Sequence, residues 1–196
     1  MIHYIATYIS HKIIINIPSE KENYDIFVYA FEKTLSELFV FLFMCILGIV
    51  TGSFSKMIIY ILFVSFLREQ TSGFHAKSQI GCILISSFIS IICIFISDYI
   101  YKLDIVLLFF FLVISIIYIS ITSPINHIAL DLTPYEVLCH KKRTHLILSC
   151  ETIIIFFSYL FPFTREISVT GSLAIITVAL FMILSKITNQ EVKHYD

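Results

Sequence analysis

The residues of this chain best suited to chemistry are a histidine and a cysteine in one polar stretch, LREQTSGFHAKSQIGC. A thiol acts as a nucleophile in its thiolate form, and a nearby imidazole can take its proton. His75 and Cys82 are seven residues apart, which on one straight helix separates them by about 10.5 Å along the axis. Because proton transfer needs a distance of about 2.6–3.2 Å, the two side chains can cooperate only if the chain bends between them.

Small residues in the same stretch offer places for that bend. Ser72-Gly73 and Gly81 allow backbone angles that other residues avoid. We therefore expect His75 on a hinge or re-entrant turn and Cys82 in the first turn of the next helix. There the helix dipole would favour a thiolate, and free backbone N–H groups could receive an oxyanion. Taken singly, each residue also fits a duller interpretation, a polar interfacial histidine and a small apolar cysteine.

The helices that must position this pair are those of a membrane protein. The 196 residues are 58% hydrophobic and 14% charged, with a mean hydropathy of +0.93, whereas a soluble domain carries about 25% charged residues. The net charge is -1, and without a basic excess we expect no nucleic-acid partner. The five cysteines show no paired spacing, so we expect no disulfide framework. No signal-peptide pattern opens the sequence, so a cleaved leader is not expected.

Six apolar runs predict an all-α polytopic membrane protein, since a span takes about 20 residues. They cover residues 35–51, 54–67, 80–97, 104–121, 146–163 and 168–187. The first two are short and separated only by Thr51-Gly52-Ser53, so a single span there is the alternative. We expect one domain over residues 1–196, with an interfacial segment at 1–30 and the transmembrane bundle at 35–187.

The first element is predicted to lie in the membrane interface. Residues 2–17 carry an isoleucine stripe at helical spacing, and a helix with one apolar face tends to lie in the interfacial plane; the stripe is Ile2, Ile5, Ile9 and Ile13. A frayed soluble leader is the alternative. Glu32 and Glu37 follow at the entrance of the first span, where a position among the headgroups is the expectation and a functional role the alternative.

Positive charge predicts cytoplasmic amino and carboxyl termini. With six spans, ten of the 13 Lys and Arg residues fall inside, and the other three, Lys56, Lys102 and Arg165, fall outside. This arrangement places the His75 and Cys82 stretch at the inner face of the cell membrane. It fails if the first two runs form one span.

Two further clusters, one of basic residues and one of possible metal ligands, lie between residues 139 and 150. Lys141, Lys142 and Arg143 fit a charge cluster that holds a long loop, about 122–145, inside the cell, and they could also receive an acidic peptide or anionic lipid. Possible metal ligands lie close by, but their spacing matches no usual zinc pattern, so no metal and no cofactor is expected; they are Cys139, His140, His145 and Cys150.

The stretch 68–82 resembles the accessory gene regulator B (AgrB) family of membrane cysteine endopeptidases. That family shows an Arg, a Gly-Gly-x-His-Ala core and a Cys seven residues after the His. The matching positions here are Arg68, Gly73, His75, Ala76 and Cys82, while Ser72 replaces the first Gly. YAFEKTL before the first span and SPINH in the long loop fit more loosely.

The resemblance implies a function. Such proteins cleave the C-terminal tail from an AgrD-like precursor peptide and lead to a cyclic thiolactone or lactone signal for quorum sensing. It implies that His75 and Cys82 are catalytic, that Arg68 and Gly73 support activity, and that the protein is a homodimer among membrane lipids. Arg68 could hold an acidic part of the peptide or anchor the second span inside. Glu69 and Gln70 are the nearest residues that could orient His75, but the sequence does not place them.

Two other classes of function stay open. One is a small permease or exporter, and the other is a non-catalytic module that binds a partner helix. A transporter should carry polar or broken helices at mid-membrane. Apart from Thr51-Gly52-Ser53 and Gly171, the spans read as uninterrupted apolar sequence, which disfavours a transporter.

Overall fold

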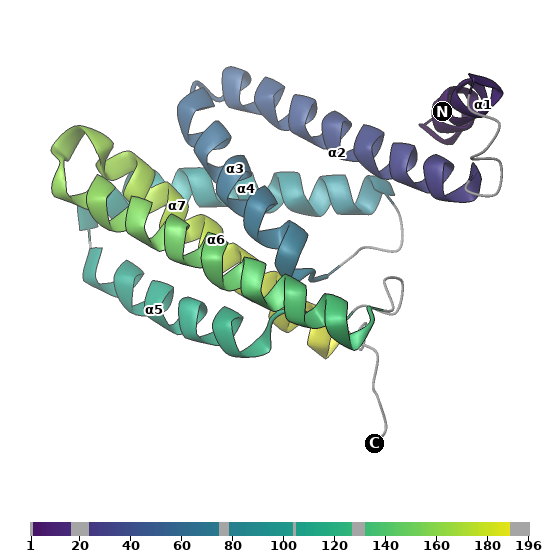
Figure 1. The fold of residues 1–196 in the computed structure, drawn as a ribbon. Coiled ribbons are helices and arrows are strands. Elements are labelled where there is room, and N and C mark those ends of the chain that lie inside the picture. Colours follow the sequence, from purple (N-terminus) through teal and green to yellow (C-terminus); the bar gives the residue numbers. More distant parts are fainter. Residues whose placement is uncertain (1, 17–23, 75–78, 104, 127–131, 189–196) are drawn as a thin grey trace. The chain divides into compact units, whose positions relative to one another are not determined.

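The computed structural model describes residues 2–16, 24–74, 79–103, 105–126 and 132–188, and within them all regular structure is helical (Figure 1). The elements are α1 (Ile2–Asn16), α2 (Tyr24–Val50), α3 (Phe54–Thr71), α4 (Gln79–Leu103), α5 (Ile105–Thr122), α6 (Pro134–Leu160), η2 (Pro162–Thr164) and α7 (Arg165–Ile187). The predicted all-α membrane class is confirmed, and each of the six apolar runs falls on one of the helices α2–α7. By length and composition, α2, α5, α6 and residues 162–187 could each cross a membrane, and Leu84–Ser97 is a shorter apolar stretch.

The chain forms two compact units, residues 1–47 and 48–196, and the single-domain organisation stays a prediction. In the first unit, the buried face of α1 carries Ala6, Ser10 and Ile14 rather than the isoleucine stripe. Ile5 of that stripe is exposed, which leaves it for an apolar surrounding such as the bilayer interface. Glu32 lies inside α2, which begins at Tyr24, and its carboxylate pairs with His3.

The first two apolar runs are separate helices. The turn between α2 and α3 is closed by two backbone hydrogen bonds, from the Gly52 N–H to the Ile49 carbonyl (3.1 Å) and from the Ser53 N–H to the Gly48 carbonyl (2.9 Å). The first two apolar runs therefore form two helices rather than one, and the orientation of the termini stays a prediction.

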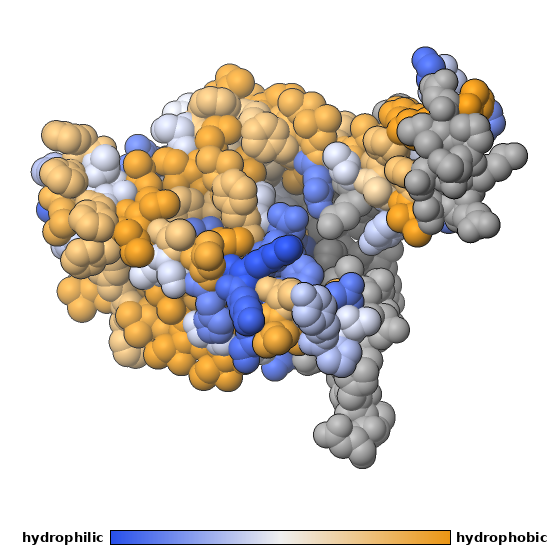
Figure 2. All heavy atoms as spheres, viewed as in Figure 1, coloured by the Kyte–Doolittle hydropathy of each residue, from blue (hydrophilic) through white to orange (hydrophobic). Residues whose placement is uncertain are grey.

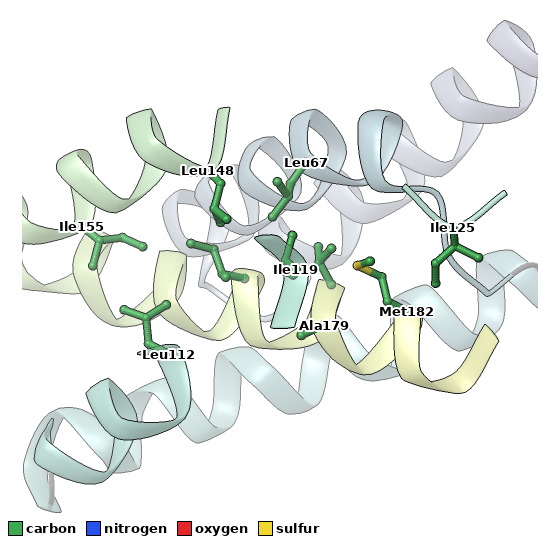
Figure 3. Packing of buried hydrophobic residues seen from close by; sticks show 10 residues of the cluster. Leu67, Leu112, Ile119, Ile125, Leu148, Ile155, Ala179 and Met182 are labelled. Atoms are coloured by element: carbon green, nitrogen blue, oxygen red, sulfur yellow. The ribbon is translucent and has the colours of Figure 1, made fainter. Parts of the chain in front are cut away.

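Helix α7 is the centre of the second unit, where it packs against α3, α4, α5 and α6. Its side chains are buried on almost every side, unlike those of the helices around it. The largest apolar cluster joins α7 to its neighbours (Figure 3). Its residues are Leu67, Leu112, Ile119, Ile125, Leu148, Ile155, Ile175, Val178, Ala179 and Met182.

Small residues let the neighbours of α7 approach closely, as is common between membrane helices. At Gly171, a Cβ atom would lie 2.8 Å from Cε1 of Phe63 on α3 and 3.1 Å from Cγ1 of Ile155 on α6. The three helices thus meet at one point where only a hydrogen fits. Small side chains also line much of the remaining surface of α7, among them Ser168, Ser172, Ala174, Thr177 and Ala179.

Helix α6 begins twelve residues before the predicted span. Thr133 and Glu136 form a capping box, in which the Thr133 hydroxyl accepts from the Glu136 N–H and the Glu136 carboxylate accepts from the Thr133 N–H (2.9 Å). Pro134 occupies the first helical turn, where its missing N–H costs nothing. The prediction that residues 141–143 lie in a loop was therefore wrong: Lys141, Lys142 and Arg143 lie on α6. This helix of 27 residues is about 40 Å long, more than a bilayer core requires.

Helix α6 also carries a buried carboxylic acid. Glu151 lies on the same face as Leu148 and Ile155, is only 5% exposed, and has no hydrogen-bond partner among the described residues for either carboxyl oxygen. The prediction that the spans are uninterrupted apolar sequence was wrong here, because Glu151 lies inside the run 146–163. It also passed over the hydroxyl groups buried along α7.

Charged residues gather at the two ends of the helices in the second unit. At one end the Lys56 ammonium lies 3.3 Å from the Glu166 carboxylate, which brings the starts of α3 and α7 together. The ends of these helices also meet, since the Phe74 N–H donates to the Phe181 carbonyl, so α3 and α7 run parallel. Lys56 and Arg165 thus share one end, and Arg68 and Lys186 the other; the side of the membrane that each end faces stays a prediction.

Large apolar side chains are exposed along the outer faces of α4, α5 and α6. Figure 2 shows hydrophobic residues over most of the visible face of α5 and α6, with a hydrophilic patch over the amino-terminal half of α6. Apolar surface of this extent is not stable in water and suits the hydrocarbon of a bilayer.

Replacing Gly171 with leucine should separate α7 from Phe63 and Ile155. Overpacking of a filled interior costs about 1–3 kcal/mol, so the melting temperature of the detergent-solubilised protein should fall. Leu180→Phe, which enlarges an exposed side chain of the same helix, should leave it nearly unchanged. Equal melting temperatures for the Gly171→Leu and wild-type proteins would show that the three helices do not meet as described.

Replacing Glu151 with leucine should stabilise the protein. A buried polar group without a partner costs about 1–3 kcal/mol, and leucine removes that group within an apolar surrounding. We expect a higher melting temperature in detergent for Glu151→Leu and little gain for Glu151→Gln, which keeps polar atoms in the same place. A marked loss of stability in the leucine variant would reveal a partner for the carboxyl group.

Candidate functional site

The polar stretch begins where α3 ends. Thr71 is the last residue of the helix, and the next two residues have positive φ angles, 57° at Ser72 and 147° at Gly73. Such angles are open to glycine but strained for a residue with a side chain, so the helix cannot continue past this point. The predicted interruption of the helix at Ser72-Gly73 is confirmed.

Of the predicted catalytic pair, the structure describes the backbone of one residue, Cys82. His75 lies outside the described residues. Cys82 is the fourth residue of α4, which begins at Gln79, so the expectation that it belongs to the start of a helix is confirmed for its backbone. The approach of the two side chains to each other stays a prediction.

The residues just before His75 are held from three sides. The Phe74 N–H donates to the Phe181 carbonyl of α7 (3.1 Å), and the Arg68 guanidinium donates to the Phe74 carbonyl through Nη2 (2.8 Å). The Ile125 N–H donates to the Thr71 carbonyl (3.0 Å). Residues 71–74 therefore form a fixed strip of backbone, which we name the anchored strip.

Arg68 acts on the anchored strip in the structure. Besides its bond to Phe74, its guanidinium lies over the ring of Phe181, 4.9 Å from the centroid, a distance typical of a cation–π contact. The sequence offered two roles for Arg68, a partner for a peptide carboxylate and a charge anchor, and neither included a hydrogen bond to its own chain. Phe181 was missed altogether, because a phenylalanine within an apolar run carries no signal that distinguishes it from its neighbours.

The two residues considered as orienting groups for His75 lie in different surroundings. The Glu69 side chain is exposed. Gln70 is only 7% exposed, and its Oε1 atom has no hydrogen-bond partner among the described residues. An acceptor is thus buried five residues before His75 in sequence, next to the anchored strip.

The remaining candidates lie elsewhere. Lys141, Lys142 and Arg143 are exposed on the amino-terminal half of α6. Among the described residues, no group of three or more His, Cys, Asp and Glu side chains could hold a metal ion. Of the cysteines other than Cys82, Cys93 contacts the Thr177 hydroxyl (3.4 Å), Cys45 and Cys139 are half-buried, and Cys150 is exposed.

Comparison with known proteins identifies the family. The family described as accessory gene regulator B matches residues 2–188, nearly the whole chain. Comparisons with individual curated proteins and with solved structures found no match. The match extends far beyond the stretch 68–82 that first indicated the resemblance and includes every helix of both units. The chain therefore belongs to the accessory gene regulator B family.

Proposed function

We propose that the protein is a membrane cysteine endopeptidase that removes the C-terminal tail of an AgrD-like precursor peptide. Family membership assigns the chain to the agr quorum-sensing system and to the membrane; the cleavage reaction is our proposal. The observation that carries it is the break after Thr71 followed by a new helix with Cys82 near its start. The first turn of a helix presents backbone N–H groups that have no partner within the helix itself, and such groups favour a thiolate and can stabilise an oxyanion.

The reaction proceeds in two acyl transfers. His75 takes the proton of the Cys82 thiol, and the thiolate attacks a carbonyl carbon of the precursor to form a C–S bond. As the C–N bond breaks, His75 returns the proton to the departing amine, and the tail leaves. The acyl group stays on Cys82 as a thioester until a Cys or Ser of the same peptide attacks it, which closes the ring and frees the thiol. Water must be excluded at this stage, because hydrolysis would give a linear peptide.

Other residues of the site serve the substrate or the backbone. Lys141, Lys142 and Arg143 are exposed on α6 and can bind an acidic segment of the precursor or anionic lipid headgroups.

Both termini are proposed to lie in the cytoplasm, as the charge distribution indicates. The active protein is proposed to be a homodimer, as the family resemblance implies.

A transporter is the second candidate function. Glu151 favours it more than the sequence suggested, because an ionisable residue buried between membrane helices often belongs to a substrate or ion pathway. A transporter would move its substrate with no bond to Cys82. Replacement of Cys82 therefore separates the two functions.

Replacing Cys82 with alanine should abolish cleavage when the protein is co-expressed with a precursor peptide encoded beside it. His75→Ala should reduce cleavage by about 10²-fold or more, the usual contribution of a general acid–base. Cys150→Ala, which changes an exposed cysteine on α6, is the matched control and should cleave normally. Membrane amounts of all variants are compared by immunoblot. Continued cleavage by the Cys82→Ala protein would refute the proposal.

Replacing Gly73 with alanine should impair processing through the backbone. A Cβ on Gly73 would lie 3.6 Å from its nearest neighbour, the Cβ of Phe181, so there is space for it. The cost of the substitution comes from the backbone angle φ of +147°, and such strain costs of the order of 1–3 kcal/mol. Gly52→Ala is the control, because Gly52 also has a positive φ but lies in the turn between α2 and α3. Both variants should melt earlier than the wild type, and only Gly73→Ala should lose more cleavage than its stability explains. Equal cleavage by the two variants would contradict a role for Gly73 in the site.

A further inference from the structure

The anchored strip depends on one residue of α7 in two ways. The Phe181 carbonyl accepts the hydrogen bond of the Phe74 N–H (3.1 Å), and the Phe181 ring supports Arg68, whose guanidinium bonds the Phe74 carbonyl. Both backbone polar groups of Phe74 therefore depend on Phe181. The Phe74 N–H bonds the Phe181 carbonyl directly, and the Phe74 carbonyl bonds Arg68, which lies over the Phe181 ring. Phe74 directly precedes His75 in the sequence.

The Phe181 side chain has no access to a substrate. It is 4% exposed, and Gly73 packs against it, since a Cβ on Gly73 would lie 3.6 Å from Cβ of Phe181. A planar guanidinium stacks on an aromatic face far better than an ammonium group does, and a leucine in place of Phe181 would offer no π face at all. The contact therefore depends on the chemistry of both partners and not on filled volume alone.

We propose that Phe181 is a positioning residue, which holds Arg68 over the Phe74 peptide and so fixes the backbone that leads to His75. Arg68 acts in the same role, on its own chain rather than on a peptide carboxylate. The inference rests on the proposed function, because it concerns the activation of Cys82 by His75. Loss of the Phe181 ring would loosen the anchored strip while the remainder of α7 stays packed.

The test measures how fast iodoacetamide alkylates Cys82 as a function of pH in the full-length protein in detergent, with each cysteine quantified by mass spectrometry. In the wild type, Cys82 should react as a thiolate well below the ordinary thiol pKa of about 8.5. In Phe181→Leu and in Arg68→Lys the profile should move toward the ordinary thiol by at least about one pH unit, which is a roughly tenfold lower rate at pH values below the midpoints of both profiles. Phe181→Tyr, which keeps a π face, should restore the wild-type profile.

Phe63→Leu is the matched control. Phe63 is a partly buried phenylalanine that packs against the same apolar cluster and meets α7 at Gly171, so its loss removes similar packing at another level of α7. Hydrogen exchange of the Phe74 amide supplies a readout of the anchored strip that needs no chemistry at Cys82. This exchange should be faster in Phe181→Leu than in the wild type, and unchanged in Phe63→Leu.

The outcomes separate the two proposals. An ordinary thiol profile for Cys82 in the wild type would overturn the proposed function, and this inference with it. An activated wild-type profile that Phe181→Leu leaves unchanged would overturn the inference alone. Equal shifts in Phe181→Leu and Phe63→Leu would overturn it too, because they would assign the effect to general packing.

Discussion

The second unit depends on the burial of α7 by its neighbours. A helix enclosed on nearly all sides cannot carry large side chains everywhere, and α7 meets this constraint with serine, threonine, alanine and glycine on its contact surfaces. In lipid, where the hydrophobic effect gives no preference for helix over hydrocarbon, such close packing is the main source of association. At Gly171 the approach of Phe63 and Ile155 leaves no room for a side chain.

The same helix determines where α3 stops and how its end is held. Parallel packing brings the ends of α3 and α7 together, so that the backbone of Phe74 meets the backbone of Phe181. A turn with two positive φ angles would be costly to keep in place by local contacts alone. Its hydrogen bonds to α7 and to Ile125 offset this strain, and they give the chain a fixed direction before it reaches His75.

Much of the architecture could be predicted because hydropathy and glycine act locally. The six helices, the turn at residues 51–53, the end of α3 at Ser72-Gly73 and the position of Cys82 near the start of a helix all follow from nearby residues. The early start of α6 was missed because polar residues 134–145 look like a loop unless the capping box at Thr133 is noticed.

Contacts between distant parts of the chain could not be predicted from the sequence. The role of Phe181 depends on which of several phenylalanines in apolar runs meets Arg68, and only the packing of α3 on α7 decides this. The buried face of α1 differs from its most apolar stripe for a related reason, since exposed isoleucines are favourable in lipid. Glu151 was overlooked because only the packing of α6 shows that this acidic residue lies on the buried face of the helix.

The dependence of the anchored strip on α7 also orders events during synthesis. The ribosome completes residues 71–74 more than a hundred residues before it reaches Phe181, so a nascent chain carries these residues before their support exists. The backbone of residues 71–74 thus acquires its fixed surroundings only when the last helix is in place. An incomplete chain, truncated before α7, lacks that support from the start.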